Sequence, residues 1–290
     1  MTRLPIVVTI VLVLVATATA QQTPPVFRGR TDRVRVDVTV TDRNRPVTGL
    51  KAEDFRIKDN GVEIPELELA TITGGISVAI ALDLGPGVQE WGWEEMQLAC
   101  DAVIEVLEPR NTAWLVTFSD EIGLKAGPVR SKLQLRRALA NVSFGQGSAL
   151  WDALFGSISI VTGQPGRAMV VVLSDGRERG SFLDRKRALE VLQRSEVVVA
   201  AIRPPHQPIG FLGLEDVVKL TGGEILQGKK GDPGRKIVAD LVEQFRLGYV
   251  LTYAPTGVPE PKDGWHELEV SLKKKRGEVH ARKGYYTPGR

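Results

Sequence analysis

The sequence predicts an α/β protein in which a doubly wound, mostly parallel sheet is flanked by sandwich-like β segments from both ends of the chain. Residues 34–72 and 247–285 alternate apolar and polar side chains between turn residues, which is typical of antiparallel strands. Residues 76–245 instead alternate short apolar runs with amphipathic helical patterns, which is typical of βα units on a parallel sheet. Because each β-rich end is too short to bury a core alone, we expect the two ends to pair, with the α/β segment inserted between them.

The N-terminal β segment, residues 32–73, opens with strict alternation of side-chain type. The valines from Val34 to Val40 share one face and charged or hydroxyl side chains share the other, so we expect a half-buried strand. The Asn60-Gly61 pair then marks a hairpin, because these residues readily adopt the positive φ angles of a tight turn. Strands are expected on both sides of that turn, at 55–58 and 62–72.

The α/β segment, residues 74–245, begins where the hydrophobic period changes. Strongly apolar short runs predict buried parallel strands, and runs with a period of about 3.6 residues predict the helices between them. Strands are expected at 76–82, 113–118, 168–173, 197–202 and 224–226, and helices at 89–107, 131–140, 149–161, 182–194, 210–220 and 234–245. The C-terminal β segment, residues 246–290, returns to strand-like runs at 247–253, 265–272 and 278–285.

Residues 1–20 have the pattern of a secretory signal peptide. Arg3 precedes an apolar run, and small residues lead to a cleavage site after Ala20. The run is too short to span a bilayer readily, and an uncleaved N-terminal anchor is the alternative. No later apolar stretch is long enough for a membrane span, so we expect an exported protein, periplasmic or secreted, with a linker at residues 21–31.

The composition argues against several classes of function. Lys and Arg total 38 against 35 Asp and Glu, so no global electrostatic field favours nucleic acid as a partner. The basic cluster at residues 273–276 lies between strand-like runs, where a solvated hairpin tip is expected. Cys100 is the only cysteine, which excludes an intrachain disulfide. It falls on the apolar stripe of the helix predicted at 89–107, so we expect it to be buried.

The sequence contains no recognisable enzyme motif. A nucleophile elbow, a P-loop and a dinucleotide-binding glycine motif are all absent from the sequence. The three histidines, His206, His266 and His280, are too far apart in the sequence to suggest a zinc site. We therefore predict that the protein is not an enzyme and has no catalytic residues.

Several short motifs are spread over residues 32–287. They are Val38-Thr39-Val40-Thr41-Asp42, Pro46-Val47-Thr48-Gly49-Leu50, Glu53-Asp54-Phe55, Gly147-Ser148-Ala149-Leu150-Trp151-Asp152-Ala153-Leu154, Val171-Val172-Leu173-Ser174-Asp175-Gly176 and Arg282-Lys283-Gly284-Tyr285-Tyr286. As a set, these motifs resemble the von Willebrand factor A (VWFA) family, and most closely the bacterial VWFA-related domain proteins. The resemblance implies a binding module whose ligand site lies at the carboxyl ends of the parallel strands.

The resemblance also implies a metal-ion-dependent adhesion site. In this family an Asp-x-Ser-x-Ser motif, a Thr and an Asp come from separate loops, and their oxygen ligands suit Mg²⁺ or Mn²⁺. Asp83 matches the first Asp, Ser148 stands where the Thr would be, and Asp175 matches the last Asp. Gly85 and Gly87 replace the two serines, so the site is degenerate. Either waters complete the shell of a bound cation, or no metal binds and these residues only shape their loops.

These features predict an exported protein that binds another protein or a matrix component through the face carrying Asp83, Gly85, Gly87, Ser148 and Asp175. Trp91 and Trp93 follow the Asp83 loop and are candidate ligand contacts, because exposed Trp is typical of binding hot spots. The alternative for the two tryptophans is that they fasten the following helix to the sheet. The alternative function is a metal-independent structural or assembly component of the cell envelope that makes its contacts through the β segments.

Overall fold

The computed structural model describes residues 33–70, 72, 74–203, 213–227 and 235–287. The predicted signal peptide (1–20), the predicted linker (21–31) and His206 lie outside these ranges. Within the described ranges, the structure has no helix of the length and apolar character needed to cross a membrane.

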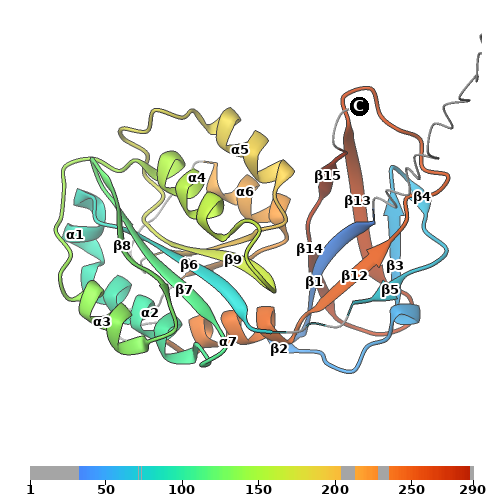
Figure 1. Cartoon of the computed structure of the whole chain (residues 1–290), viewed down its shortest axis with the longest axis horizontal. Helices are drawn as coiled ribbons and strands as arrows, with labels where there is room; N and C mark the ends of the chain where they lie inside the picture. The colour runs from blue at the N-terminus through green and yellow to red at the C-terminus, as the bar shows by residue number, and fades with distance from the viewer. Residues whose placement is uncertain (1–32, 71, 73, 204–212, 228–234, 288–290) are drawn as a thin grey trace, which may run out of the picture. The chain divides into compact units, whose positions relative to one another are not determined.

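The α/β segment is built on a six-stranded sheet. Its strands are β6 (Ile76–Asp83), β7 (Thr112–Phe118), β8 (Ile122–Val129), β9 (Arg167–Leu173), β10 (Val198–Arg203) and β11 (Ile225–Gln227). They lie in the order β11-β10-β9-β6-β7-β8 (Figure 1). All neighbours are parallel except β8, which pairs with β7 in the antiparallel direction. Strand β8 was not predicted, because Gly123, Gly127 and Pro128 interrupt its apolar alternation.

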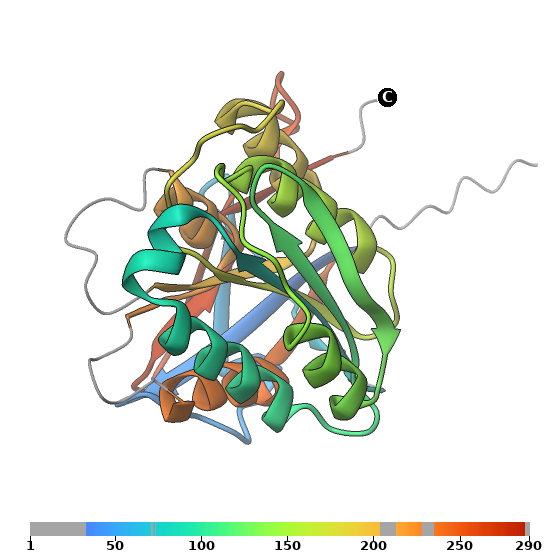
Figure 2. The ribbon, with the colours of Figure 1, turned by 90° about the vertical axis from the view of Figure 1, so that its left-hand side faces the viewer.

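Helices cover both faces of this sheet. One face carries α1 (Pro86–Trp91), α2 (Trp93–Val106), α3 (Lys132–Leu139) and α7 (Arg235–Leu247), and the other carries α4 (Leu150–Val161), α5 (Arg185–Arg194) and α6 (Leu214–Thr221). Figure 2 shows α2 and α7 packed side by side. Alternate residues of β6 separate the two cores, with Val78 and Ile80 in the first and Ala79 and Ala81 in the second. The small alanine side chains let α4 pack closely on the centre of the sheet.

Three helices differ in extent from the prediction, and one of these is α6, which was expected at 210–220 and spans Leu214–Thr221. The helix expected at 89–107 is divided into α1 and α2, because the backbone of Gly92 between them leaves helical geometry, with φ −166° and ψ 14°. Cys100 is buried in α2, as expected. The helix expected from residue 182 begins instead at Arg185, because the Asp184 side chain accepts a hydrogen bond from the backbone N–H of Arg187 and caps the first turn. Phe182 therefore lies in the loop before α5.

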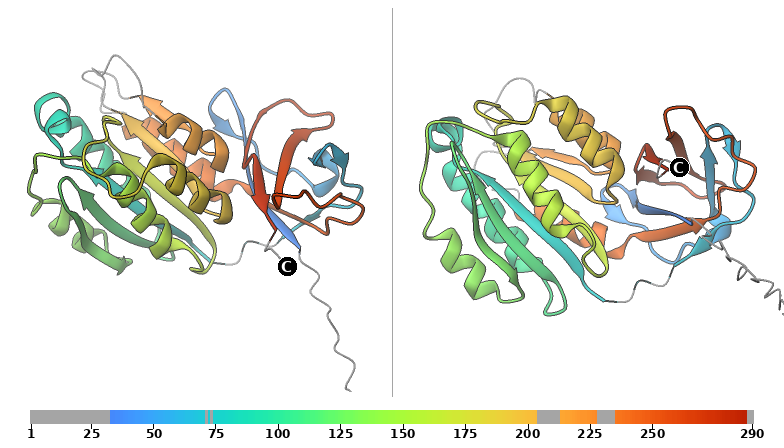
Figure 3. Two further views of the ribbon diagram at one scale, coloured as in Figure 1. Left: turned by 90° about the horizontal axis from the view of Figure 1, so that it is seen from above. Right: turned by 45° about the horizontal axis from the view of Figure 1, so that its top comes forward.

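Two antiparallel sheets lie outside the α/β segment (Figure 3), and buried side chains from both form a third core. The first contains β1 (Val34–Asp42), β2 (Arg45–Pro46), β5 (Glu68–Leu69), β12 (Tyr249–Tyr253) and β14 (Glu278–Ala281), and the second contains β3 (Phe55–Asp59), β4 (Val62–Glu63), β13 (Trp265–Leu272) and β15 (Gly284–Tyr286). A short 3₁₀ helix, η1 (Ala52–Asp54), precedes β3. Strands from the two ends of the described chain pair directly, β1 with β12 and β14, and β3 with β13. The predicted fold class, a mostly parallel α/β sheet with sandwich-like β segments from both ends, is confirmed.

Two of the predicted strands are each divided between the two antiparallel sheets. The run at 62–72 forms β4, which pairs with β3, and β5, which pairs with β12. Pro65 lies between them and cannot donate a ladder hydrogen bond. The run at 278–285 forms β14, which pairs with β1, and β15, which pairs with β13. The chain therefore crosses between the sheets at both points, and this closes the sandwich.

The polar face of β1 is not exposed to solvent as the alternation predicted. Asp37 and Thr41 are buried, because α7 packs against β1. Arg167, the first residue of β9, is 1% exposed and forms an ion pair with Asp37. Its guanidinium group also lies over the ring of Phe245, 4.0 Å from the ring centroid. These contacts join the α/β segment to the β sandwich, and the described residues form one compact unit.

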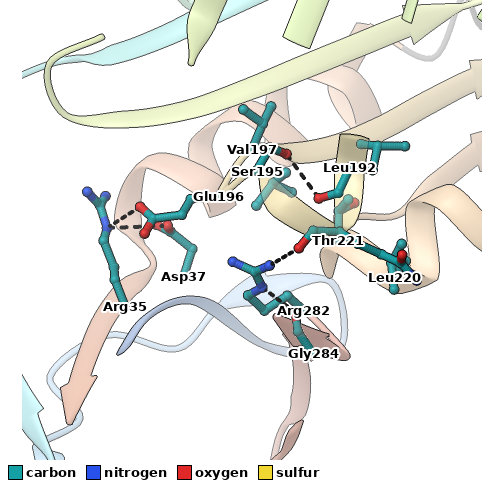
Figure 4. Close-up of a pocket in the computed structure, with 12 residues that line it drawn as sticks. Arg35, Asp37, Leu192, Ser195, Glu196, Val197, Leu220, Thr221, Arg282 and Gly284 are labelled. Atoms are coloured by element: carbon teal, nitrogen blue, oxygen red, sulfur yellow. Dashed lines mark hydrogen bonds and ion pairs between the residues drawn. The ribbon is translucent and has the colours of Figure 1, made fainter. Parts of the chain in front are cut away.

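A small cavity lies beside this junction (Figure 4). Its volume is about 10 Å³, which is room for about one water molecule. Arg35 is directed at two carboxylates there, with its Nε 3.6 Å from Asp37 and 3.8 Å from Glu196. The cavity is therefore a gap in an ionic junction and is too small for a ligand.

Candidate functional site

The loops at the carboxyl ends of β6, β7 and β9 meet at one edge of the parallel sheet. The backbone N–H of Leu84, just after β6, donates to the carbonyl of Phe118 at the end of β7, at 2.8 Å. The N–H of Gly145 donates to Leu84, and the N–H of Ala149 donates to Ser119. These bonds bring the loop before α4 onto the loops of β6 and β7. We call this region, with Asp83, Gly85, Gly87, Ser148, Ser174 and Asp175, the carboxyl edge.

Asp83 lies at the centre of the carboxyl edge and is 1% exposed. Its Oδ1 accepts a hydrogen bond from the N–H of Gly85 at 2.8 Å. Its Oδ2 accepts from the hydroxyls of Ser174 at 2.6 Å and Ser148 at 3.2 Å. Burial, together with the nearby charge of Asp175, raises the pKa of Asp83 to about 7, although the hydrogen bonds that Asp83 accepts oppose this rise.

Ser148 holds two loops together. Its backbone N–H donates to the carbonyl of Arg179 at 3.0 Å, and the N–H of Arg179 donates back to the Ser148 carbonyl at 2.8 Å. This antiparallel bridge ties the loop after β9 to the loop before α4. Because both backbone groups of Ser148 are used in the bridge, its hydroxyl is fixed close to Asp83.

Asp175 occupies the space beside Gly87. A Cβ atom added to Gly87 would lie 1.8 Å from Oδ2 of Asp175, so no side chain fits at position 87 unless the carboxylate moves. A Cβ atom on Gly85 would lie 2.6 Å from the carbonyl oxygen of Gly147. Oδ1 of Asp175 accepts from the N–H of Arg177, and Oδ2 is buried without a hydrogen bond from the described residues. The Nε of Arg177 lies 3.5 Å from Oδ2 and supplies a positive charge there.

This donor set does not fit the divalent-metal site that the resemblance implies. The hydroxyl ligands expected at positions 85 and 87 are absent, and neighbouring atoms fill the space that their side chains would need. Both oxygens of Asp83 already accept hydrogen bonds from Gly85, Ser148 and Ser174. The described residues also contain no group of three His, Cys, Asp or Glu side chains placed to hold a metal ion. The carboxyl edge is instead a closed polar cluster whose charge Arg177 balances in part.

The sequence pattern placed Asp83, Ser148 and Asp175 together, and the structure brings all three to the carboxyl edge. It also adds Ser174, whose contact with Asp83 was not predicted. The only feature of the sequence that could have indicated Ser174 is its place as a polar residue directly after the strand predicted at 168–173. Trp93 is half-buried and packs edge-on against Phe144, with ring centroids 5.0 Å apart. The side chain of Trp91 lies outside what the structure describes.

Comparisons with known proteins bear on the fold. No protein-family model matches the chain, and no curated protein matches it either. Among solved structures, the conserved hypothetical protein BatB from Bacteroides thetaiotaomicron matches with a TM-score of 0.50 and 14% sequence identity, covering 59% of this chain and 98% of that one. Proximal thread matrix protein 1 from the mussel byssus, with a zinc-occupied MIDAS motif, matches with a TM-score of 0.51 and 17% identity, covering 64% of this chain and 48% of that one.

These likenesses concern the fold, because the sequence identities are low. The structural neighbours of the chain are von Willebrand factor A domain proteins, so the resemblance found in the sequence is confirmed. The zinc in the MIDAS motif is a property of the mussel protein, and the likeness to it shows the fold alone.

Proposed function

We propose that this chain is an exported protein that binds another protein or a matrix component through its carboxyl edge, and that binding needs no metal. The fold supports the first part, because α/β sheets of this kind bind ligands at the carboxyl ends of their strands. The predicted signal peptide supports export to the periplasm or the medium. The absence of a recognisable enzyme motif favours binding over catalysis.

The close approach of Asp175 to Gly87 carries the metal-independent part of the proposal. Two serines at positions 85 and 87 would supply hydroxyl ligands, but here the Asp175 carboxylate takes up the space at position 87 and the carbonyl oxygen of Gly147 takes up the space at position 85. Asp83 is satisfied by three protein donors and does not require a cation. The hydrogen bonds that close the cluster also hold the loops in one arrangement. A preordered surface of this kind loses little conformational entropy when a partner binds.

A photocrosslinking experiment tests where the partner binds. A photoreactive amino acid is placed at Gln146, an exposed residue of the carboxyl edge, and in a matched variant at Lys262, an exposed residue between β12 and β13. Irradiation of producing cells should give one discrete adduct from position 146, and none from position 262. An adduct from position 262 alone would instead support the envelope component that acts through its β sandwich, and would contradict the proposal.

Calorimetry separates metal-dependent from metal-independent binding. We expect no binding heat when Mg²⁺ or Mn²⁺ is titrated into the mature protein, and adducts from position 146 should persist in a chelator. Submillimolar binding that is lost in Asp83→Ala and in Ser148→Ala would show a working metal site. Two variants are needed because Asp83 is buried, so its replacement can also disturb the loops. Circular dichroism confirms that each variant is folded.

A further inference from the structure

Phe182 is the most exposed large apolar side chain among the described residues. It lies in the loop between β9 and α5 and is 98% exposed. The next most exposed residues of this kind, Leu133 and Leu124, are 57% and 56% exposed. An aromatic ring in water gains nothing for folding, because it removes no apolar surface from solvent. Its position therefore calls for an explanation other than stability.

The backbone beneath Phe182 is firmly held. Asp152, in the first turn of α4, accepts hydrogen bonds from the N–H groups of Phe182 at 2.7 Å and Leu183 at 2.8 Å. One residue earlier, Ser181 donates through both its N–H and its hydroxyl to the Glu178 carboxylate, each at 2.8 Å. A fixed backbone that presents an aromatic ring is a preordered anchor, since few rotatable bonds remain to be fixed on binding.

The segment around Phe182 presents more positive than negative charge. Its basic residues are exposed: Arg177, Arg179, Arg185, Lys186 and Arg187. The carboxylates of the two acidic residues in the segment accept hydrogen bonds from backbone N–H groups. Glu178 accepts from Ser181, and Asp184 accepts from Arg187. Arg185 pairs with Asp216, and Arg177 with Asp175. The remaining positive charge suits a partner that presents carboxylates.

The same segment is continuous with the carboxyl edge. The bridge between Ser148 and Arg179 joins the loop of Phe182 to the loop that carries the Ser148 hydroxyl. Phe155, which is 40% exposed, lies three residues after Asp152 on α4, so both project from one side of that helix. Apolar surface therefore extends beside the loop, and a partner on the carboxyl edge would also meet Phe182.

We infer that Phe182 is the anchor of a docking surface formed by residues 177–187, and that the partner is a protein with an apolar pocket bordered by carboxylates. This inference rests on the proposed binding function and adds the anchor and the partner's chemistry. A lipid surface is the less suitable occupant, because a single ring gives little insertion and two of the arginines are paired with carboxylates. A protein pocket can bury one ring completely, as aromatic hot spots require.

The test uses a displayed library of disulfide-constrained random peptides, panned on the mature protein in the presence of a chelator. Enriched peptides should combine Asp or Glu with apolar residues, and their affinity should fall as salt is added. Their dissociation constants are measured by fluorescence anisotropy for the wild type, for Phe182→Ser, and for the control Leu133→Ser on α3. We expect Phe182→Ser to weaken binding by at least about thirtyfold, as loss of an aromatic hot spot does, and Leu133→Ser to leave it unchanged.

The outcomes separate this inference from the proposed function. Some peptides could keep their affinity for Phe182→Ser and lose it for Gln146→Trp. That result would support binding at the carboxyl edge and overturn the role of Phe182 as the anchor. If neither variant weakens the binding of any selected peptide, the result would contradict both the proposed function and the inference about Phe182. Sedimentation with vesicles containing phosphatidylserine tests a lipid surface as the partner. If the protein binds these vesicles and Phe182→Ser abolishes that binding, the ring inserts into a membrane and the inference is wrong. Because Phe182 is exposed, its variant should keep the wild-type melting temperature, which excludes misfolding as the cause.

Discussion

Replacing Arg167 by Met should destabilise the protein strongly, although Arg167 lies far from the carboxyl edge. Its guanidinium group pairs with Asp37, donates to the carbonyl of Phe245 and lies over the Phe245 ring. Burial lowers the pKa of Arg167, and the charge of Asp37 opposes that change. Removing one partner of a buried ion pair costs about 3–5 kcal/mol, because the other charge is left without compensation. Arg35 stays 3.6 Å from Asp37, so we expect the lower end, about 3 kcal/mol.

The assay is urea denaturation followed by circular dichroism, with the free energy of unfolding compared at a fixed pH. Lys58→Met is the matched control, because Lys58 and Glu269 form an exposed pair at 3.2 Å that should contribute at most about 1 kcal/mol. The double variant Arg167→Met/Asp37→Leu should recover more than half of the loss, since apolar residues then replace both charges. A loss below about 1 kcal/mol for Arg167→Met, or a double variant as unstable as the sum of its parts, would refute this account of the junction.

Three further predictions concern other buried or loop-holding carboxylates. Because the pKa of Asp83 rises from its ordinary value of 3.8 to about 7 in the fold, its charged form is disfavoured there, and stability falls as pH rises from about 4 to about 7. Asp83→Asn should therefore match the wild type near pH 4 and exceed it at pH 8 by up to about 4 kcal/mol in urea titrations. Asp59 is fully buried and accepts hydrogen bonds from Tyr253 at 2.8 Å and Tyr285 at 2.7 Å, so Asp59→Ala should lower stability by about 3 kcal/mol in thermal denaturation. Asp152→Ala should speed hydrogen exchange at the backbone amides of Phe182 and Leu183, because both now donate to the Asp152 carboxylate. The melting temperature should change little.

The spacing of apolar residues along the sequence was enough to predict most helices and strands of the α/β segment. A buried strand such as β6 is apolar along its whole length, and Ser131 marks the start of α3 because its hydroxyl accepts from Gln134. Period alone does not say which sheet a strand joins. The runs at 62–72 and 278–285 looked continuous, yet each supplies strands to two sheets. That choice depends on contacts between the two ends of the chain, which no local pattern contains.

The candidate site was predictable in part for a similar reason. Asp83 ends β6, Ser148 lies just before α4 and Asp175 lies just after β9, at positions that the family resemblance marks. The fold brings these three residues together. The glycines at positions 85 and 87 were visible in the sequence, but the position of the Asp175 carboxylate beside Gly87 was not. Phe182 was assigned to a helix, because its apolar side chain suits a helical pattern. Only the cap at Asp184 shows that the helix begins later.

Closing this site without a cation raises an electrostatic problem, since Asp83 and Asp175 are both buried there. The structure answers it in two ways. Arg177 places a guanidinium beside Asp175, and the raised pKa of Asp83 lets that group hold a proton near neutral pH. Both answers use groups inside the cluster: Oδ2 of Asp175 accepts no hydrogen bond from the described residues, but the Nε of Arg177 lies 3.5 Å from it. Under the proposed metal-independent binding, recognition comes from side chains that point outward, and Phe182, whose backbone N–H donates to Asp152, is the most exposed large apolar side chain among the described residues.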